Sequence, residues 1–232
     1  MTHKTVRALA TLAACALLVA ACSDSSDDSG DDASDEATEE SAGGGEDVDV
    51  EGLDYAGALF TTEDFESFVP GDYVVDDQGA EDNEPIHGLC GEAPAGPAAT
   101  GGEFLIIQDA GPSISFLTSV QAYETEDEAE QAFSLARSTV ESCEEFVEQG
   151  DPFVTIAPVE IPESGDESLD LFTMKLDTDL LVADHFVRNG QFVFDVRMVR
   201  SQDSTFSAET LATMASEAQD KFNGWVEEQG AG

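Results

Sequence analysis

The order of β-rich and amphipathic helical segments constrains the fold of this chain more than any single motif. Two segments have apolar residues at helical spacing, one from 125 to 147 and the other from 207 to 226. Thr125 and Glu128 form a capping-box pattern at the start of the first segment, and Gly150 is a typical stop after it. Each predicted helix has one apolar face, so each is expected to lie on a sheet.

β-rich segments fall before and between these two helices, and turn-forming residues separate them. The predicted strands are 104–108, 114–123, 153–161, 168–176, 180–188 and 191–199. Asn189-Gly190, between the last two, is the strongest type of short hairpin signal. A shorter helix is predicted near 62–68. The segment order therefore predicts an α+β domain, with a mostly antiparallel sheet packed against two long amphipathic helices.

The first 21 residues have the pattern of an export signal. Lys4 and Arg7 precede an apolar run from 8 to 21, which is too short for a membrane-spanning helix of about 20 apolar residues. The run ends in Val19-Ala20-Ala21-Cys22, which resembles the lipobox of bacterial lipoprotein signal peptides. The resemblance implies cleavage before Cys22 and acyl chains, including palmitate, at that residue. Two alternatives stay open: cleavage at the similar Leu12-Ala13-Ala14-Cys15, and an ordinary secretory signal followed by an incidental cysteine.

A lipid on Cys22 would anchor the chain to the outer face of the cytoplasmic membrane. Residues 23–51 contain thirteen Asp and Glu residues and no Lys or Arg. Such a segment cannot bury enough apolar surface to offset the entropy lost on ordering, so 22–52 is expected to be a disordered tether. Binding of a partner by this acidic segment is the alternative. One domain, 53–232, is expected to follow the tether.

The acidic character continues through the predicted domain. From Gly52 onward the formal net charge is −32. Nucleic acid is excluded as a partner because affinity for phosphates depends on Lys and Arg. So much like charge costs stability unless salt screens it, which suggests a halophilic or salt-tolerant source. A surface selected only for solubility is the alternative explanation.

Cys90 and Cys143 are the cysteines that remain after Cys15 is removed with the signal and Cys22 is modified. Outside the membrane such a pair is expected to form a disulfide, which would close a span of 53 residues. Metal binding by the two thiolates is the alternative, but no CxxC pattern supports it.

No motif commits the chain to a reaction or a cofactor. The sequence lacks the Gly-x-Ser-x-Gly, phosphate-binding glycine-loop and His-Glu-x-x-His patterns. The mature chain has two histidines, His87 and His185, too few for the common zinc sites. The acidic stretch 76–84 fails the calcium-loop template because its glycine is at the fourth position, so a solvated loop is expected there. We therefore expect neither a metal site nor an enzyme.

Polar residues on the predicted hairpin form a candidate ligand or cation site. With Asn189-Gly190 as the two-residue turn, Asp184 would face Asp195. Arg197 would lie diagonal to Asp184, while His185 would point to the opposite, apolar face. Apposed carboxylates raise each other's pKa and attract a cation or a hydrogen-bonding ligand. The candidate site comprises Asp184, His185, Asp195 and Arg197; the alternatives are a core histidine and an Asp pair neutralised by Arg197.

Several segments of the predicted domain are similar to one known family. The stretch from Leu59-Phe60-Thr61-Thr62 to Pro70-Gly71-Asp72-Tyr73 resembles the start of PknH-like extracellular sensor domains, which occur in actinobacterial kinases and in free lipoproteins. The cysteine-bearing helix 126–143, the strand pair around Asn189-Gly190 and the closing helix at Lys221-Phe222 are also similar. The resemblance implies a compact α+β domain with a cleft that senses or binds a ligand. Members often have two disulfides, whereas this chain can form one.

We therefore expect a membrane-anchored, extracytoplasmic module that binds or senses a small molecule or lipid. Its pocket is expected to be lined by residues such as Phe133, Phe194 and Trp225. The alternative is a structural protein of the envelope that engages another protein through its surface. An enzyme would need the hairpin carboxylates, Asp195 in particular.

Overall fold

The computed structural model describes residues 48–81, 85–86, 89–92, 95–109, 114–148, 150–157, 159–163, 165–178, 180–201 and 207–230. Cys22, His87, most of the predicted tether and the predicted turn at 110–112 lie outside these residues. No helix in the described part of the chain has the length and apolar composition needed to cross a membrane.

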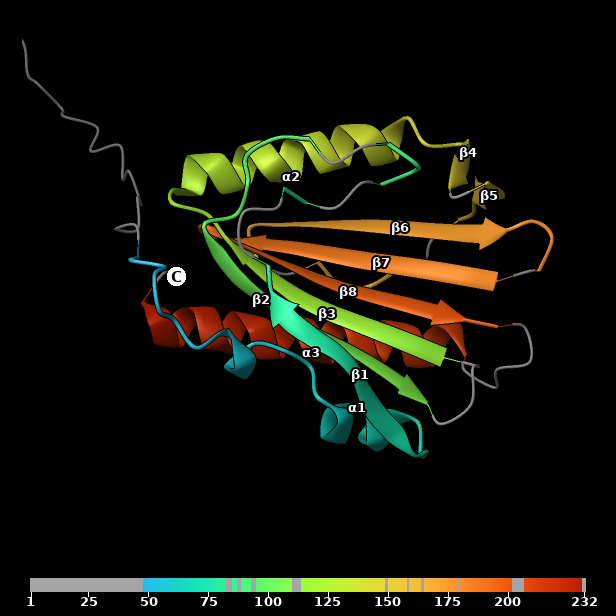
Figure 1. Cartoon of the computed structure of the whole chain (residues 1–232), viewed down its shortest axis with the longest axis horizontal. Coiled ribbons are helices and arrows are strands. Elements are labelled where there is room, and N and C mark those ends of the chain that lie inside the picture. The colour runs from blue at the N-terminus through green and yellow to red at the C-terminus, as the bar shows by residue number, and fades with distance from the viewer. Residues whose placement is uncertain are drawn as a thin grey trace, which may run out of the picture. The chain divides into compact units, whose positions relative to one another are not determined.

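An eight-stranded sheet forms the centre of the described structure, and every neighbouring pair of strands in it is antiparallel (Figure 1). The spatial order of the strands is β1-β2-β3-β8-β7-β6-β5-β4. Two meanders, β1 to β3 and β4 to β8, meet where β8 pairs with β3, and helix α2 connects them along the chain. The bounds are Tyr73–Ala80 (β1), Gly101–Asp109 (β2), Ile114–Ala122 (β3), Glu145–Glu148 (β4), Asp151–Thr155 (β5), Glu167–Lys175 (β6), Leu180–Asn189 (β7) and Phe192–Arg200 (β8).

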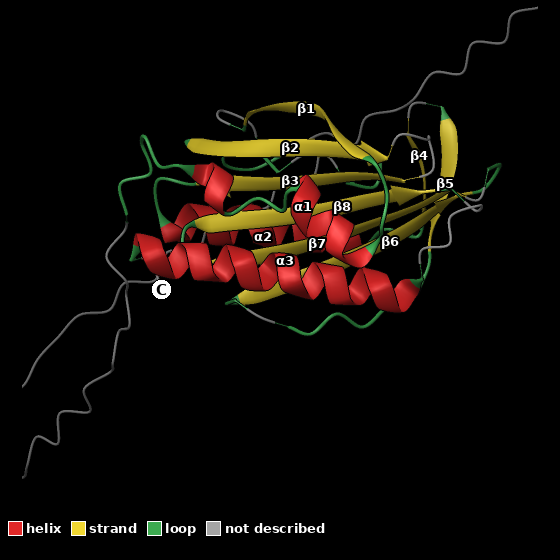
Figure 2. Cartoon of the chain, turned by 90° about the horizontal axis from the view of Figure 1, so that it is seen from below, coloured by secondary structure: helices red, strands yellow, loops and turns green. Residues whose placement is uncertain are grey.

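Helices α2 (Glu126–Glu141) and α3 (Ala208–Gln229) pack on opposite faces of this sheet, as the view in Figure 2 shows. Thr125 caps α2 as predicted, because it accepts a hydrogen bond from the Glu128 N–H, and Ser207 caps α3 by accepting one from the Thr210 N–H. The sheet therefore has two covered faces, and strand residues alternate between two separate cores.

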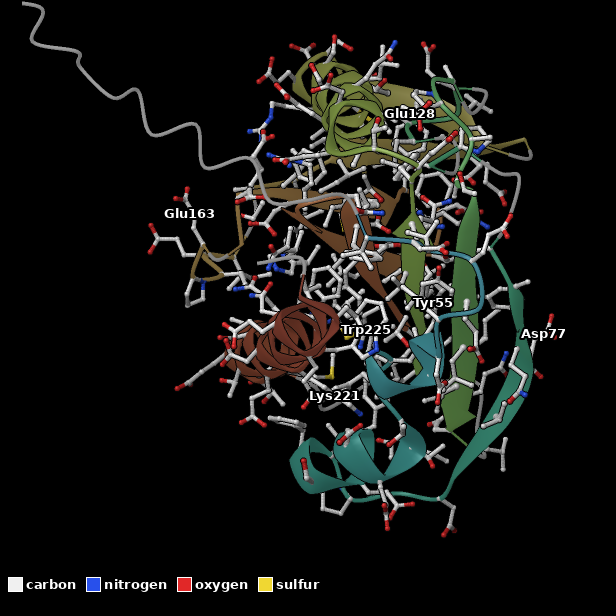
Figure 3. All side chains as sticks on the ribbon, turned by 90° about the vertical axis from the view of Figure 1, so that its left-hand side faces the viewer. Tyr55, Asp77, Glu128, Glu163, Lys221 and Trp225 are labelled. Carbon is white, nitrogen blue, oxygen red and sulfur yellow. A yellow bond between two sulfur atoms is a disulfide. The ribbon has the colours of Figure 1, made fainter. Side chains whose placement is uncertain are left out.

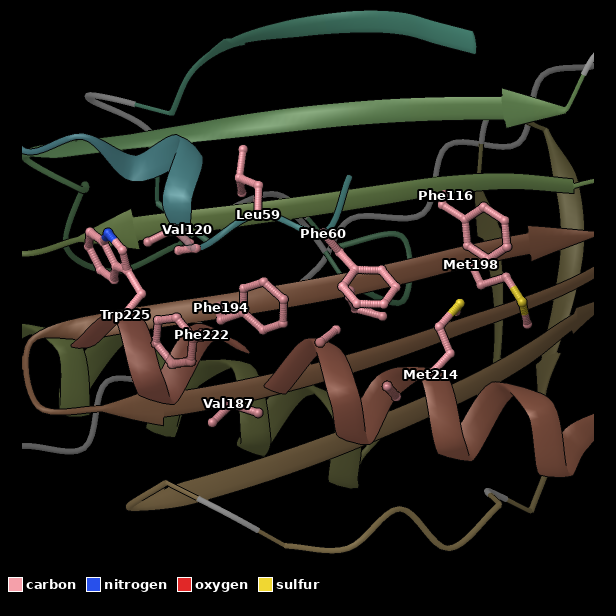
Figure 4. Close-up of a cluster of buried hydrophobic side chains, with 14 of the residues drawn as sticks. Leu59, Phe60, Phe116, Val120, Val187, Phe194, Met198, Met214, Phe222 and Trp225 are labelled. Atoms are coloured by element: carbon pink, nitrogen blue, oxygen red, sulfur yellow. The ribbon is translucent and has the colours of Figure 1, made fainter. Parts of the chain in front are cut away.

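The larger core lies between the sheet and α3 (Figure 4). Phe222 of α3 stacks on Phe194 of β8 with ring centroids 5.0 Å apart. Trp225 packs against Tyr55, at 5.7 Å, in the short helix η1 (Tyr55–Gly57), and Figure 3 shows both rings between α3 and the strands. The N-terminal segment is thus held in this core by aromatic contacts.

Helix α1 (Thr62–Phe68) has the bounds predicted from the sequence. It lies on the same face as α3, and Phe65 stacks on Phe116 of β3 at 4.0 Å. The Thr61 N–H and hydroxyl both donate to Asp64, at 2.7 and 2.8 Å, which completes the cap of this short helix. Lys221 of α3 reaches the same carboxylate at 2.8 Å and so links the two helices.

The smaller core lies between the sheet and α2. Phe133 of α2 and Phe186 of β7 are fully buried in it. Its other fully or largely buried members are Ile86, Leu89, Ala99, Tyr123, Ala129, Ala132, Ala136, Leu171 and Val193. The α+β fold class, the mostly antiparallel sheet and the Cys90–Cys143 disulfide are confirmed.

The predicted extent of the helix in α2 is wrong. The apolar periodicity suggested a helix to Val147, but the helix ends at Glu141, and β4 begins at Glu145. Strand pairing prevails because Phe146 pairs with Phe153 of β5, where the two rings stack at 5.2 Å. Gly150, with φ 94°, lies between β4 and β5 instead of ending a helix.

The acidic stretch 76–84 was predicted to be a solvated loop, but its first part is a strand. Its first five residues belong to edge strand β1, which pairs with β2 through a bulge between Val75 and Asp77. This strand is mostly exposed, so its sequence lacks the apolar alternation that marks a half-buried strand. Gly79 fits beneath Phe104, because a Cβ there would lie 2.9 Å from that ring.

The packed part of the chain begins a few residues before the predicted boundary at 53. Val50 is buried in the larger core, and its carbonyl accepts a hydrogen bond from the Tyr55 hydroxyl at 2.8 Å. The Gln191 side chain bonds both the N–H and the carbonyl of Val48, at 2.6 and 2.8 Å. The chain therefore joins the sheet at the turn between β7 and β8.

Candidate functional site

The β7–β8 hairpin has a register two residues away from the predicted one. Asn189 pairs with Phe192, so the turn consists of Gly190 and Gln191, with Gly190 at φ 56°. Tertiary contacts fix this choice, because the Asn189 amide donates to Asn223 of α3 and Gln191 bonds the incoming chain. A shift of two residues keeps every side chain on its predicted face but changes its partner across the strands.

The shifted register brings Asp184 directly opposite Arg197, where Asp195 was predicted. Arg197 Nε donates a hydrogen bond to Asp184 Oδ1 in a tight ion pair. The Asp184 side chain is 3% exposed and that of Arg197 is 28% exposed, so Arg197 is the member of the pair that a ligand in the pocket can contact. Asp195 lies on the same face, opposite Phe186 of β7 and Ser119 of β3.

The two carboxyl groups differ in environment. Burial, reinforced by the nearby Asp184 charge, raises the pKa of Asp195 well above its usual range, and Arg197 only partly opposes this. Burial of Arg197 would lower its pKa, but the charges of Asp184 and Asp195 outweigh it and raise that pKa. This face of the hairpin therefore combines an ion pair with a buried carboxyl group that resists ionisation.

His185 is separated from the other candidate residues. It lies on the α3 face of the sheet and is 2% exposed. Its Nδ1 is 2.7 Å from Asp170 Oδ1, and its Nε2 is 2.6 Å from Gln219 Oε1 of α3. A core histidine with both ring nitrogens hydrogen-bonded is therefore the reading that the structure supports.

A pocket of about 270 Å³ opens on the α2 face of the sheet, beyond the C-terminal end of α2. Figure 1 shows β4 and β5 at this end of the sheet. We refer to it as the disulfide-side pocket because Cys90 contributes to its lining. The full lining is Leu89, Cys90, Phe146, Glu148, Asp151, Phe153, Leu171, Thr173, Lys175, Leu180, Val182, Asp184, Arg197 and Val199.

The disulfide and the β4–β5 hairpin form one side of the pocket. The Cys90–Cys143 bond attaches the segment at 89–92 to the end of α2, with Cα atoms 6.0 Å apart. This segment lies directly on β4, since a Cβ on Gly91 would be 2.8 Å from the Val147 carbonyl oxygen. The stacked Phe146 and Phe153 rings supply the apolar part of this side.

Two further carboxylates line the pocket, and they come from β4 and β5. Glu148 and Asp151 face each other across these two strands. Lys175 of β6 donates to Asp151 Oδ2 at 2.7 Å, a hydrogen bond that raises the Lys175 pKa. The pocket thus has charged groups at two places, Arg197 with Asp184 on the floor and Glu148 with Asp151 at the hairpin.

The expected lining residues are not in this pocket. Phe133 is fully buried beneath α2, and Phe194 and Trp225 lie in the core under α3. The apolar wall comes instead from β4 and β5. The sequence of β4 had been predicted as the end of a helix. The pattern Glu145-Phe146-Val147-Glu148, followed by Gly150 and Asp151-Pro152-Phe153, is a hairpin signal that could have revealed it.

The pocket and the junction with the N-terminal segment lie at opposite ends of β7 and β8. Val48 is bound at the β7–β8 turn through Gln191, whereas Leu180, at the start of β7, lines the pocket. A ten-residue strand is about 30 Å long. The first described residues of the chain therefore join the sheet far from the pocket.

In the described part of the chain, no group of three or more His, Cys, Asp or Glu side chains could hold a metal ion. The donor set of the pocket suits hydrogen bonding and ion pairing with an organic ligand, because two of its three acidic groups, Asp151 and Asp184, are already paired with cations.

The sequence matches no protein-family model and no curated protein. Several solved structures match the chain. The extracellular domain of PknH from Mycobacterium tuberculosis aligns with a TM-score of 0.54 and 11% identity, over 73% of this chain and 95% of that one. An Rv0999 ortholog from Mycobacterium smegmatis aligns with a TM-score of 0.41 and 12% identity, over 76% of this chain and 97% of that one. The predicted PknH-like fold is confirmed.

Proposed function

We propose that this protein is a membrane-anchored, extracytoplasmic ligand-binding or sensing module, and that its ligand binds in the disulfide-side pocket. The observation that carries the proposal is the composition of this pocket: an apolar wall beside a reachable guanidinium held by a buried carboxylate. Ligand sites in proteins combine mostly apolar walls with a few fixed polar groups in this way.

The size of the pocket restricts the ligand. Its volume of about 270 Å³ is slightly below the roughly 300–1,000 Å³ typical of sites for drug-sized molecules. A small molecule fits this volume better than a lipid with a long acyl chain. Of the two ligand classes expected from the sequence, we therefore propose the small molecule.

The location outside the cytoplasmic membrane is part of the same proposal. It is supported by the Cys90–Cys143 disulfide, since such bonds persist in oxidising compartments, and by the fold of an extracellular domain. Anchoring through a lipid on Cys22 adds the membrane as a partner. Replacement of Cys22 by Ala should release the protein or leave it unprocessed, whereas unchanged membrane retention would refute the anchor.

Native mass spectrometry of the protein purified from its own membrane tests the binding proposal. The wild-type protein is expected to carry a small molecule. The variant Val182→Trp should lose it, because the larger side chain fills the pocket floor, whereas Val182→Ile should keep it. A wild-type protein that is free of small molecules under gentle conditions, or equal occupancy in the Trp variant, would refute the proposal.

A structural or interaction protein of the envelope is the second candidate. Val147 and Leu176 are 64% and 52% exposed, and both lie beside Pro152, which pairs with Val147 and accepts the Leu176 N–H. Exposed apolar side chains at one place are typical of contact surfaces. In the same mass spectra this candidate predicts an associated polypeptide whose presence does not depend on Val182.

A further inference from the structure

The disulfide-side pocket offers a hydrogen-bond donor of fixed orientation. The Arg197 guanidinium has five N–H groups, and the one on Nε is directed to Asp184. The pair holds the guanidinium plane in place, and the Arg197 side chain is part-exposed and lines the pocket. A planar fork of this kind binds a carboxylate through two parallel hydrogen bonds.

The pocket offers acceptors on its other side. Glu148 and Asp151 are paired across β4 and β5, and Lys175 neutralises one of these two carboxylates. The remaining negative charge near the hairpin is complementary to an ammonium group of a ligand. The charge of Glu148 also acts on Arg197, so the two binding groups lie within electrostatic reach of each other.

The overall charge argues against a ligand that is a net anion. The lining contains three acidic residues and two basic ones, and the domain as a whole carries a formal charge of −32 from Gly52 onward. A molecule with one positive and one negative group satisfies both sides of the pocket without adding net charge.

Most of the rest of the lining is apolar. The stacked Phe146 and Phe153 rings form the wall, and the branched side chains Val182, Leu180 and Val199 surround the floor. These groups are complementary to an aliphatic or aromatic side chain. The volume of about 270 Å³ suits a ligand of the size of one amino acid.

We propose that the ligand is a small zwitterion of the α-amino-acid type with an apolar side chain. Its carboxylate binds the Arg197 guanidinium, its ammonium binds the Glu148 carboxylate, and its side chain packs on Phe146 and Phe153. This assignment rests on the proposed function and names the ligand class of that pocket.

Calorimetric titration of the full-length protein with L-leucine and two truncated analogues tests the assignment. Isocaproate lacks the ammonium group and isoamylamine lacks the carboxylate, while both keep the side chain. L-Leucine should bind, and each analogue should bind about tenfold more weakly or worse, because one polar group of the pocket is left without its partner. Equal affinity for leucine and either analogue would overturn the zwitterion assignment.

Variants assign the two charged groups of the ligand to their sites. Glu148→Gln should weaken leucine binding about tenfold and leave isocaproate binding unchanged. Glu145→Gln is the matched control, because Glu145 is an exposed residue of the same strand that does not line the pocket. Arg197→Lys keeps the charge but loses the fork, so it should weaken leucine binding and leave isoamylamine binding unchanged. A Glu148→Gln protein that binds leucine as the wild type does would contradict the proposed pose.

Native mass spectrometry distinguishes failure of this assignment from failure of the proposed function. If leucine does not bind, the assignment is wrong, and the small molecule seen by native mass spectrometry decides the rest. A molecule that is bound in wild type and absent in Val182→Trp then preserves the pocket as the ligand site. Absence of any such molecule refutes both.

Discussion

Two buried carboxyl groups on the β7–β8 hairpin show how neighbouring residues set the environment of a carboxyl group. Asp184 and Asp195 share one face of the β7–β8 hairpin and are both almost completely buried. Asp184 forms an ion pair with Arg197, whereas burial raises the pKa of Asp195. The difference between them gives two predictions at the scale of single residues.

Replacing Arg197 by Leu should lower the free energy of unfolding by about 3 kcal/mol, because the buried Asp184 carboxylate then has lost its cation. The double variant Asp184→Leu/Arg197→Leu should recover most of this loss, since no charge is left uncompensated. Urea unfolding at neutral pH measures both values. A double variant as unstable as the single one would show that the charge pair is not the cause.

The raised pKa of Asp195 predicts how the stability depends on pH. Above the ordinary value near 3.8, the unfolded chain has released this proton while the folded protein still holds it, so the free energy of unfolding falls as pH rises until the folded-state pKa is passed. Asp195→Asn cannot lose a proton there. Its stability relative to wild type should therefore increase with pH through this window, as thermal melts at a series of pH values can show. Parallel stability curves for the two proteins would contradict the assignment.

At the scale of elements, strong periodicity was sufficient to predict α1, the starts of α2 and α3, and five of the strands within a few residues. The hairpin faces were also predictable, because a side chain's face depends only on the parity of its position. The end of α2 and strand β4 were not, since the helical spacing of Val140, Cys143 and Val147 continues past the point where the chain turns.

The candidate site was predictable in part for the same reason. Asp184 and Arg197 were recognised on the hairpin, and both line the pocket. Their direct pairing depends on Asn189 and Gln191 binding distant segments, which local sequence does not encode. The apolar wall of Phe146 and Phe153 depends on β4. Because β4 was predicted as part of a helix, this wall of the pocket was not predicted.

The disulfide connects these elements, and its removal should affect both stability and the pocket. It closes a span of 53 residues, worth about 4 kcal/mol in the chain-entropy model. The variant Cys90→Ser/Cys143→Ser should be less stable in urea by about this amount. Hydrogen exchange should increase first at β4 and β5, which the bond connects to the segment around Leu89. Unchanged exchange at these strands would show that the bond does not support the pocket.

At the scale of the whole molecule, the acidic surface is the dominant property. Figure 3 shows carboxylate-bearing side chains projecting around the two helix layers. The described structure includes few cations that offset them, and Arg137, Lys175, Arg188, Arg197 and Lys221 are already in ion pairs. Repulsion among the remaining acidic groups should therefore lower the stability at low salt.

Salt should raise the melting temperature. Between 0.1 and 2 M NaCl the screening length falls from about 10 Å to less than 3 Å. Each kcal/mol of repulsion removed corresponds to about 2–4 °C for a domain of this size, so an increase of several degrees is expected. A variant with exposed Asp127, Glu130 and Glu141 of α2 changed to their amides should depend less on salt. A flat salt dependence of the wild-type protein would remove the salt-tolerance hypothesis.

The position of the pocket on the molecule completes the account. The N-terminal segment joins at the β7–β8 turn, and the pocket lies at the other end of these strands. The two places are therefore about the length of a ten-residue strand apart, roughly 30 Å.

The most direct test of the account is a crystal structure of the protein isolated from its native membrane. Electron density for a small molecule is predicted in the disulfide-side pocket, between the Phe146–Phe153 wall and the Arg197 guanidinium. Density for a ligand on the α3 face instead, or a pocket closed by the protein's own side chains, would contradict it.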